Sequence, residues 1–135
     1  MMLNEEIWQK LQNLYEQNPS IKAPNATDQE IYAAQAETGF MFSDFYRYFL
    51  KSHKVTLLDH WFLYPLTSDK DKWSVVQKTK EFSFKKKEWL IIGTNNNDDL
   101  LAMNKAGEIW VLHKLGKGKM ERLAINFEAF LDQVI

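Results

Sequence analysis

The sequence predicts an α+β fold in a single domain over residues 1–135, with N-terminal helices, a central antiparallel β-sheet meander and a C-terminal helix packed on the sheet. Three observations predict it. Apolar residues recur at helical spacing through residues 1–50, short apolar runs alternate with turn residues after that, and helical spacing returns beyond residue 126. The length of 135 residues is that of one ordinary domain, and the apolar content of 45% is enough to fill its core.

The first predicted helix begins at Asn4, which we expect to cap its N-terminus, and ends before Asn18 and Pro19. Two glutamates follow the cap, where the positive end of the helix dipole favours acidic side chains. One apolar stripe runs along this helix and comprises Ile7, Trp8, Leu11, Leu14 and Tyr15.

Two further helices follow in close succession. Thr27 and Glu30 have the spacing of a capping box, in which each side chain accepts a hydrogen bond from the backbone N–H of the other residue. Gly39 is placed to end this helix in the left-handed conformation. Ser43 then caps a third helix, whose predicted apolar face comprises Phe45, Tyr46, Phe49 and Leu50.

The middle of the chain changes to short apolar runs. Residues 55–58 and 61–64 are predicted as buried strands, and Pro65 closes the second one. Ser68, which is followed by two aspartates, is predicted to start a fourth helix that ends near Phe82.

The last third of the chain predicts four strands and a final helix. The strands cover residues 89–93, 99–103, 108–113 and 120–124. A polar turn joins the first two, and a hairpin turn ending at Gly107 joins the next two. Asn126 caps the final helix, whose apolar face comprises Phe127, Phe130, Leu131, Val134 and Ile135.

The composition excludes several classes of protein. The chain has no cysteine, which rules out disulfides, zinc fingers and thiolate chemistry. Acidic residues number 18 and basic residues 17, so the net charge of −1 argues against a strongly basic nucleic-acid-binding module. No apolar run approaches the roughly 20 residues of a membrane span, and the N-terminus does not have the pattern of a signal peptide. We therefore expect a soluble, cytoplasmic protein with no membrane partner.

The sequence predicts no catalytic constellation, metal site or cofactor site. The histidines, His53, His60 and His113, are isolated, and no two share the i, i+4 spacing of a helical metal pair. Asp59 beside His60 could orient a general base, but adjacent strand residues point to opposite faces, which favours a simple turn. His113 is expected at the surface. The Asn-rich turn does not match a calcium loop, and residues 116–119 do not match a phosphate loop. We expect no enzyme activity and no cofactor.

One lysine-rich stretch is a candidate nucleic-acid-binding segment, and it comprises Lys78, Lys80, Lys85, Lys86 and Lys87. Lysine suits contact with phosphates, but the stretch has no arginine, which is better suited to reading bases. Because the overall charge is near zero, we interpret the stretch as a solvated face and do not expect nucleic-acid binding.

Two segments resemble the signature of the SUKH superfamily. In that superfamily a helix ending in Gly is followed by Leu-Pro-x-Asp-Tyr-x-x-Phe-Leu, and residues 38–50 here are TGFMFSDFYRYFL. Asp44 stands at the family Asp, whereas Met41 and Phe42 replace Leu-Pro. Residues 123–131, LAINFEAFL, resemble the family ending Leu-Ala-x-Ser-Phe-x-x-Phe-Leu. The strand order between the two segments is also similar, with an Asn-rich turn in place of a Gly-rich one.

The resemblance implies a protein-binding module rather than an enzyme. Bacterial members of the superfamily are mostly immunity proteins that bind and neutralise a secreted toxin, often a nuclease, and fungal relatives are scaffolds in cell-wall signalling. The resemblance therefore implies a cognate toxin as the partner. The alternative is a general regulatory or scaffold interaction domain without a toxin partner.

Exposed loops and sheet edges are the parts of such a domain that can cover about 800 Å² of a partner. The carboxylates of two polar turns suit the basic substrate groove of a nuclease. This hypothesis requires the side chains to be exposed, and it predicts that Asp98 and Asp99 tolerate alanine with little loss of stability. The predicted partner-binding residues are Asp59, His60 and Trp61 in the first turn and Asn95, Asn96, Asn97, Asp98 and Asp99 in the second.

Overall fold

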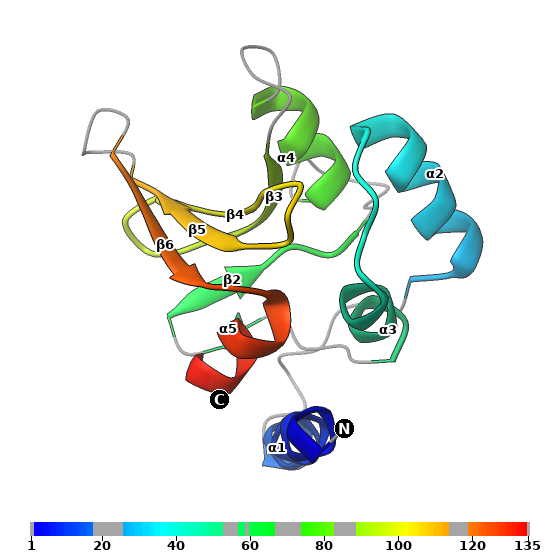
Figure 1. Ribbon diagram of the computed structural model, residues 1–135, viewed down its shortest axis with the longest axis vertical. Coiled ribbons are helices and arrows are strands. Elements are labelled where there is room, and N and C mark those ends of the chain that lie inside the picture. Colours follow the sequence, from blue (N-terminus) through cyan, green and yellow to red (C-terminus); the bar gives the residue numbers. More distant parts are fainter. Residues whose placement is uncertain are drawn as a thin grey trace.

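The computed structural model describes residues 2–17, 26–52, 57–58, 60–66, 74–82, 89–113 and 119–134. Helices precede a β-sheet and a last helix follows it (Figure 1), as the sequence predicts. The helices of this described part are α1 (Met2–Gln17), α2 (Asp28–Thr38), α3 (Asp44–Ser52), α4 (Val75–Phe82) and α5 (Phe127–Val134). Its strands are β1 (Leu57–Leu58), β2 (Trp61–Leu63), β3 (Leu90–Thr94), β4 (Leu100–Met103), β5 (Ile109–Leu112) and β6 (Met120–Ala124).

Helix α1 packs on the C-terminal helix through the predicted apolar stripe. Ile7 and Leu11 are fully buried, and the Lys10 Nζ atom lies 3.1 Å from the Asp132 carboxylate of α5. The prediction that Asn4 caps this helix is wrong, because α1 begins two residues earlier and Asn4 lies within its first turn. A cap residue recognised by type alone does not fix the first helical residue, since Asn also occurs inside helices.

Helices α2 and α3 begin and end at the residues that the sequence predicts. The Glu30 backbone N–H donates to Thr27 Oγ1 (3.1 Å) and the Thr27 N–H donates to the Glu30 carboxylate (2.9 Å), which completes the capping box. Gly39 follows α2 with a φ of 76°, in the left-handed region. Ser43 Oγ accepts from the Tyr46 N–H (3.2 Å) and so caps α3.

Helix α4 ends at Phe82 as predicted. Its described start is capped by Ser74, which the sequence does not predict as a cap. Ser74 Oγ accepts a hydrogen bond from the Gln77 backbone N–H at 3.1 Å. The predicted start at Ser68 lies outside the described residues. Two valines follow Ser74 directly, and β-branched residues weaken the helical signal at that point.

The six strands form one antiparallel sheet in chain order, which confirms the predicted meander. Strands β1 and β6 are its two edges. Gly93 lies where β3 approaches β2 closely, because a Cβ atom at this position would lie 2.6 Å from the carbonyl oxygen of Phe62. Only glycine therefore fits this position without separating the two strands.

An aromatic cluster joins α5 to α3. The Phe127 ring contacts Tyr46 and Phe49 edge-on, at centroid distances of 4.8 Å and 5.1 Å. Burial raises the pKa of the Tyr46 hydroxyl far above its ordinary value.

In Figure 1, α5, α3 and α1 lie below the sheet, whereas α4 and α2 lie above and beside it. Asn126 Oδ1 caps α5 by accepting from the Ala129 N–H (2.8 Å), as predicted.

Strand β3 is buried on both faces. The consecutive residues Leu90, Ile91 and Ile92 are at most 1% exposed, and neighbouring strand residues point to opposite faces. The register of β3 against β4 shifts between Ile91 and Gly93. There the Ile91 backbone N–H donates to the Oγ1 of Thr79 on α4, at 2.9 Å. The helix thus satisfies a buried donor of the strand.

Replacing Thr79 by valine should lower the free energy of unfolding by about 1–3 kcal/mol, because the Ile91 N–H would be buried without an acceptor. Thr79→Ser keeps the hydroxyl and should cost roughly 1 kcal/mol or less. Urea unfolding monitored by tryptophan fluorescence measures both values. Equal losses in the two variants would show that the hydrogen bond contributes nothing.

Candidate functional site

The two turns that are predicted to bind a partner lie at the same end of the sheet. Strands β2 and β3 are antiparallel neighbours, and Phe62 pairs with Thr94. The pairing ends at Phe62 and Thr94, so His60, which precedes β2, and Asn95, which follows β3, lie at the same end of the sheet. The β1–β2 turn and the β3–β4 turn therefore form one continuous end of the sheet, which the left side of Figure 1 shows.

Asn95 organises the β3–β4 turn. Its Oδ1 atom accepts from the backbone N–H groups of Asn97 (2.9 Å) and Asp99 (3.1 Å). Its side-chain amide donates to the Asp99 carboxylate (3.2 Å). The Thr94 hydroxyl donates to the backbone carbonyl of Asp99 at 2.9 Å. Asn95 is therefore an internal support of the turn rather than a residue that projects toward a partner.

The β4–β5 hairpin, at the other end of the sheet, repeats the same chemistry. Asn104 Oδ1 accepts from the Glu108 N–H at 2.9 Å, and the Asn104 amide donates to the Glu108 carboxylate at 2.8 Å. Arg122 also donates to this carboxylate, at 2.9 Å. Both turns thus have Asn at the first position and an acidic residue four positions later, a spacing that is visible in the sequence.

The fourth position of each turn has a left-handed backbone. In the β4–β5 hairpin this residue is Gly107, with a φ of 87°. In the β3–β4 turn it is Asp98, with a φ of 60°, which is the one positive φ at a non-glycine among the described residues. Because glycine adopts this region at no steric cost, Asp98 gives up some conformational stability at an exposed site.

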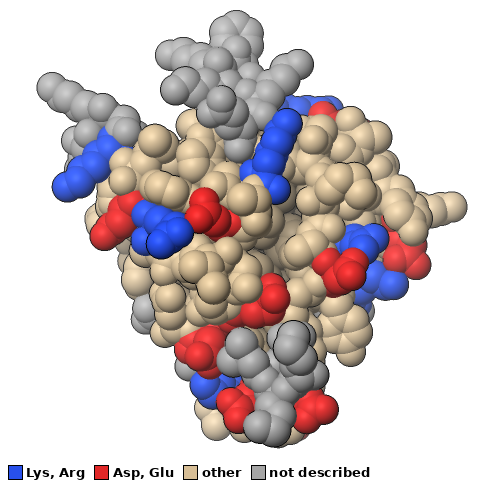
Figure 2. Space-filling model, in the orientation of Figure 1, with Lys and Arg blue, Asp and Glu red and all other residues tan. Residues whose placement is uncertain are grey.

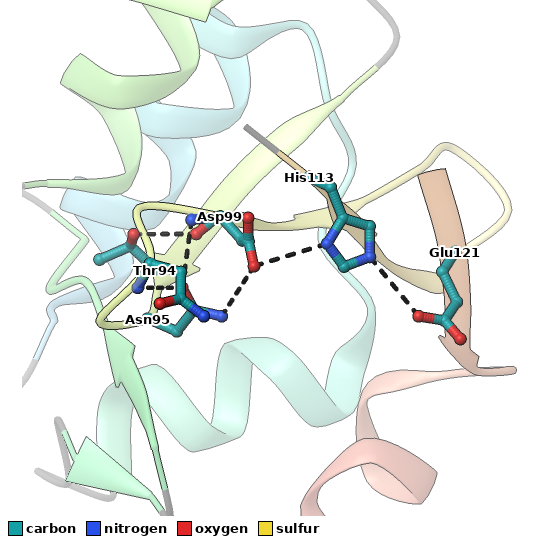
Figure 3. A network of polar contacts seen from close by, with 6 residues as sticks. Thr94, Asn95, Asp99, His113 and Glu121 are labelled. Atoms are coloured by element: carbon teal, nitrogen blue, oxygen red, sulfur yellow. Dashed lines mark hydrogen bonds and ion pairs between the residues drawn. The ribbon is translucent and has the colours of Figure 1, made fainter. Parts of the chain in front are cut away.

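Asp99, His113 and Glu121 form a row of polar contacts behind the turn (Figure 3). His113 Nδ1 lies 3.5 Å from the Asp99 carboxylate, and Nε2 lies 3.5 Å from the Glu121 carboxylate. The His113 backbone N–H also donates to the carbonyl of Lys119 at 2.9 Å. These contacts link the start of β4 to the end of β5 and the start of β6. His113, expected at the surface, is partly buried within the row.

The predicted partner-binding residues divide into exposed and buried groups. Exposed side chains are those of His60, Asn96, Asn97 and Asp98, while Asn95 is partly buried. Trp61 is 4% exposed and Asp99 is 8% exposed, so the prediction that these two side chains are accessible is wrong. Trp61 pairs with the buried Leu58 of β1 on the core face, and Asp99 is covered by its contacts with Asn95 and His113. Asp59 lies outside the described residues.

The described part of the lysine-rich stretch pairs with acidic side chains. Lys80 Nζ lies 2.8 Å from Glu37 on α2, and Lys78 Nζ lies 3.5 Å from Glu81. Lys85, Lys86 and Lys87 lie outside the described residues. Figure 2 shows acidic and basic side chains interspersed over one face of the molecule, without a large field of one sign.

The described histidines and carboxylates do not converge on a point. The carboxylates of Asp99 and Glu121 lie at opposite nitrogens of the His113 ring, so the three groups face away from any common ligand. Within the described residues, no group of three or more His, Asp or Glu side chains could hold a metal ion. None of the helices in the described ranges is long and apolar enough to span a membrane.

The fold and its exposed turns define a small α+β domain whose distinctive surface is one end of an antiparallel sheet. Residues 25–133 match the model of the SMI1 / KNR4 family (SUKH-1), and the chain belongs to this family. The SUKH superfamily includes toxin immunity proteins and is generally non-catalytic. This confirms the resemblance in residues 38–50 and 123–131. A comparison with curated proteins finds no significant match.

Replacing Asn95 by alanine should destabilise the protein by about 1–2 kcal/mol, because the Asp99 N–H would lose its acceptor in a partly buried turn. Asn96→Ala, at the exposed neighbouring position, is the matched control and should stay within about 0.5 kcal/mol of wild type. Thermal unfolding followed by circular dichroism measures both. A similar loss in the two variants would contradict the role of Asn95.

The Asn104–Glu108–Arg122 cluster should make stability depend on pH. Hydrogen bonds from Asn104 and then Arg122 hold the pKa of Glu108 below its ordinary value. A lowered folded-state pKa stabilises the protein above the unfolded-state pKa, and this stabilisation disappears as pH falls through the folded-state pKa. Glu108→Gln should therefore lower the melting temperature slightly at pH 7, and the difference from wild type should disappear as the pH falls through the lowered pKa of Glu108. A difference that persists at acid pH would contradict this.

Proposed function

We propose that this protein is a bacterial immunity protein that binds a cognate toxin, such as a nuclease. It neutralises the toxin in the cytoplasm of the producing cell by forming a complex rather than by catalysis. Membership of the SMI1 / KNR4 family carries this proposal, because the superfamily includes toxin immunity proteins. The paired turns at one end of the sheet supply the contact surface, and their residues His60, Asn96, Asn97 and Asp98 are exposed.

Asp98 is the residue of this surface whose placement supports binding most directly. The equivalent position of the β4–β5 hairpin has glycine, and both backbones are left-handed. An aspartate held in the left-handed region, which glycine adopts without strain, indicates that the carboxylate itself has a role at this position. An exposed carboxylate at the tip of a turn suits a basic side chain of a toxin.

The direct test is protection of a growing culture. The chain is co-expressed with each toxin encoded in the open reading frames beside its own gene, and growth is compared with that of cells expressing the toxin alone. Rescue of growth, together with a stoichiometric complex of the two purified proteins, supports the proposal. Complex formation with a non-toxic neighbour would instead favour a scaffold domain, and rescue without a complex would contradict inhibition by binding.

Asp98→Gly should weaken the toxin complex and change the stability of the fold little. Glycine adopts the left-handed backbone without strain but raises the conformational entropy of the unfolded chain, so the free energy of unfolding should stay within about 1 kcal/mol of wild type. Toxin binding should weaken by about 1–3 kcal/mol if Asp98 lies near the centre of the interface. The reciprocal variant Gly107→Asp is the matched control, since it makes the opposite exchange in the other turn and should leave toxin binding unchanged.

Calorimetric titration with the toxin, combined with urea unfolding, measures both effects. An unchanged dissociation constant for Asp98→Gly would remove Asp98 from the interface. The buried Asp99 is not a suitable probe, because its removal would disturb the turn and the contact with His113.

A further inference from the structure

A continuous row of side chains crosses all six strands on one face of the sheet. The register pairs Leu57 with Phe62, Phe62 with Thr94, Thr94 with Leu100, Leu100 with Leu112, and Leu112 with Met120. Directly paired residues of antiparallel strands point to the same face. These six residues therefore form one row, the cross-strand row, in which every member except Thr94 is apolar.

The cross-strand row is accessible, whereas the opposite face is not. Leu57 is 46% exposed and Met120 is 50% exposed at the two edges, and Phe62, Thr94 and Leu100 are partly exposed between them, whereas Leu112 is buried. On the opposite face the neighbouring side chains of β1 to β5 are at most 4% exposed, and Glu121 of the edge strand β6 is exposed. The buried side chains comprise Leu58, Trp61, Leu63, Leu101 and Val111. The sheet thus has one face inside the core and one apolar row that reaches solvent.

The length of the cross-strand row suits the centre of a protein interface. Strands lie about 4.8 Å apart, so six strands span roughly 24 Å. The row is only one residue wide, so most of the roughly 800 Å² per partner of a standard protein–protein interface would fall on the residues that border it. An accessible apolar row bordered by polar turns also has the arrangement of such interfaces, which have an apolar centre and a polar rim.

Asp98 lies in the turn that borders the cross-strand row. Thr94 and Leu100 are paired members of the row, and they flank the β3–β4 turn in which Asp98 is exposed. Burial raises the pKa of the Tyr64 hydroxyl and a hydrogen bond with Thr94 lowers it, while the negative charge of Asp98 raises it further. The Asp98 carboxylate therefore lies at the end of the sheet where the row lies.

We propose that the cross-strand row is the apolar centre of the toxin interface, and that the toxin presents aliphatic or aromatic side chains to the row and a basic side chain to Asp98. This inference rests on the proposed function. A second copy of this chain fits the surface less well. Arg122, the basic residue of the described strands on this face, already pairs with Glu108 and would not reach out to Asp98 of another copy.

The first experiment compares two double variants in calorimetric titrations with the toxin found by the protection assay. Leu57→Ser with Met120→Ser changes the two most exposed members of the row and should weaken binding at least about tenfold. Met41→Ser with Ile125→Ser changes one Met and one aliphatic residue that are 82% and 65% exposed outside the row, and should change binding less than about twofold. Equal effects of the two double variants would overturn the proposal.

A charge comparison tests the basic side chain of the toxin. Asp98→Asn should weaken binding about fivefold or more at low salt, and Lys119→Gln, at an exposed residue before β6, should not weaken it. The opposite result would overturn the assignment of a basic toxin residue to Asp98. Sedimentation of the protein alone should show a monomer, and a dimer dissolved by the row variant would show that a second copy covers the row.

A peptide titration separates failure of this inference from failure of the proposed function. Amide chemical shifts are followed while a strand peptide of alternating Leu and Lys is added, with an alternating Leu and Glu peptide as the control. Shift changes for the Leu–Lys peptide should centre on Phe62, Leu100 and Met120, and the Leu–Glu peptide should cause smaller ones. Changes centred elsewhere would overturn the inference even if the toxin is neutralised, and changes on the row would uphold the surface even if no toxin is found.

Discussion

Strand β3 must be covered on both faces, and the arrangement of the other elements depends on this constraint. Three consecutive side chains, Leu90, Ile91 and Ile92, are almost completely buried. The register shift next to Ile91 takes its N–H out of the regular ladder, and Thr79 of α4 accepts that hydrogen bond. Helix α4 is therefore tied to the centre of the sheet by a buried polar contact as well as by apolar packing. Lys80 of the same helix then pairs with Glu37, which fixes α2 beside it.

The cross-strand row is accessible because the helices cover the two faces of the sheet to different extents. One face is closed by the helices around Phe127, whose ring contacts Tyr46 and Phe49 of α3. The other face is covered where Trp89 packs edge-on against Trp110, at a centroid distance of 5.9 Å. The cross-strand row lies two residues further along the strands, near the turns, and stays accessible. Because burying apolar side chains is thermodynamically favourable, this accessible row is the centre of the interface that we propose.

Two turns with the same hydrogen-bond scheme differ in the residue at their fourth position. Gly107 relieves the left-handed backbone of one turn, whereas Asp98 keeps a carboxylate in the same geometry in the other. The row formed by Asp99, His113 and Glu121 holds the second turn against β5 and β6. A rigid turn loses little conformational entropy on binding. In the proposed complex, the exposed Asp98 carboxylate would therefore be preorganised for the partner.

The sequence alone determined the features that depend on neighbouring residues. The capping box of Thr27 and Glu30, the left-handed Gly39, the caps Ser43 and Asn126, and the strands of the meander all follow from local periodicity and short-range hydrogen bonds. The Asn-x-x-x-Asp and Asn-x-x-x-Glu spacings are present in the sequence but do not by themselves predict these turns. The hydrogen bonds of the Asn side chains depend on a backbone geometry that residue types do not specify. The tertiary structure alone decided which of the selected turn residues are accessible. Trp61 and Asp99 are buried, and Leu57, Phe62 and Met120 share one face, because burial and register are set by strands that are distant in the chain and paired in space.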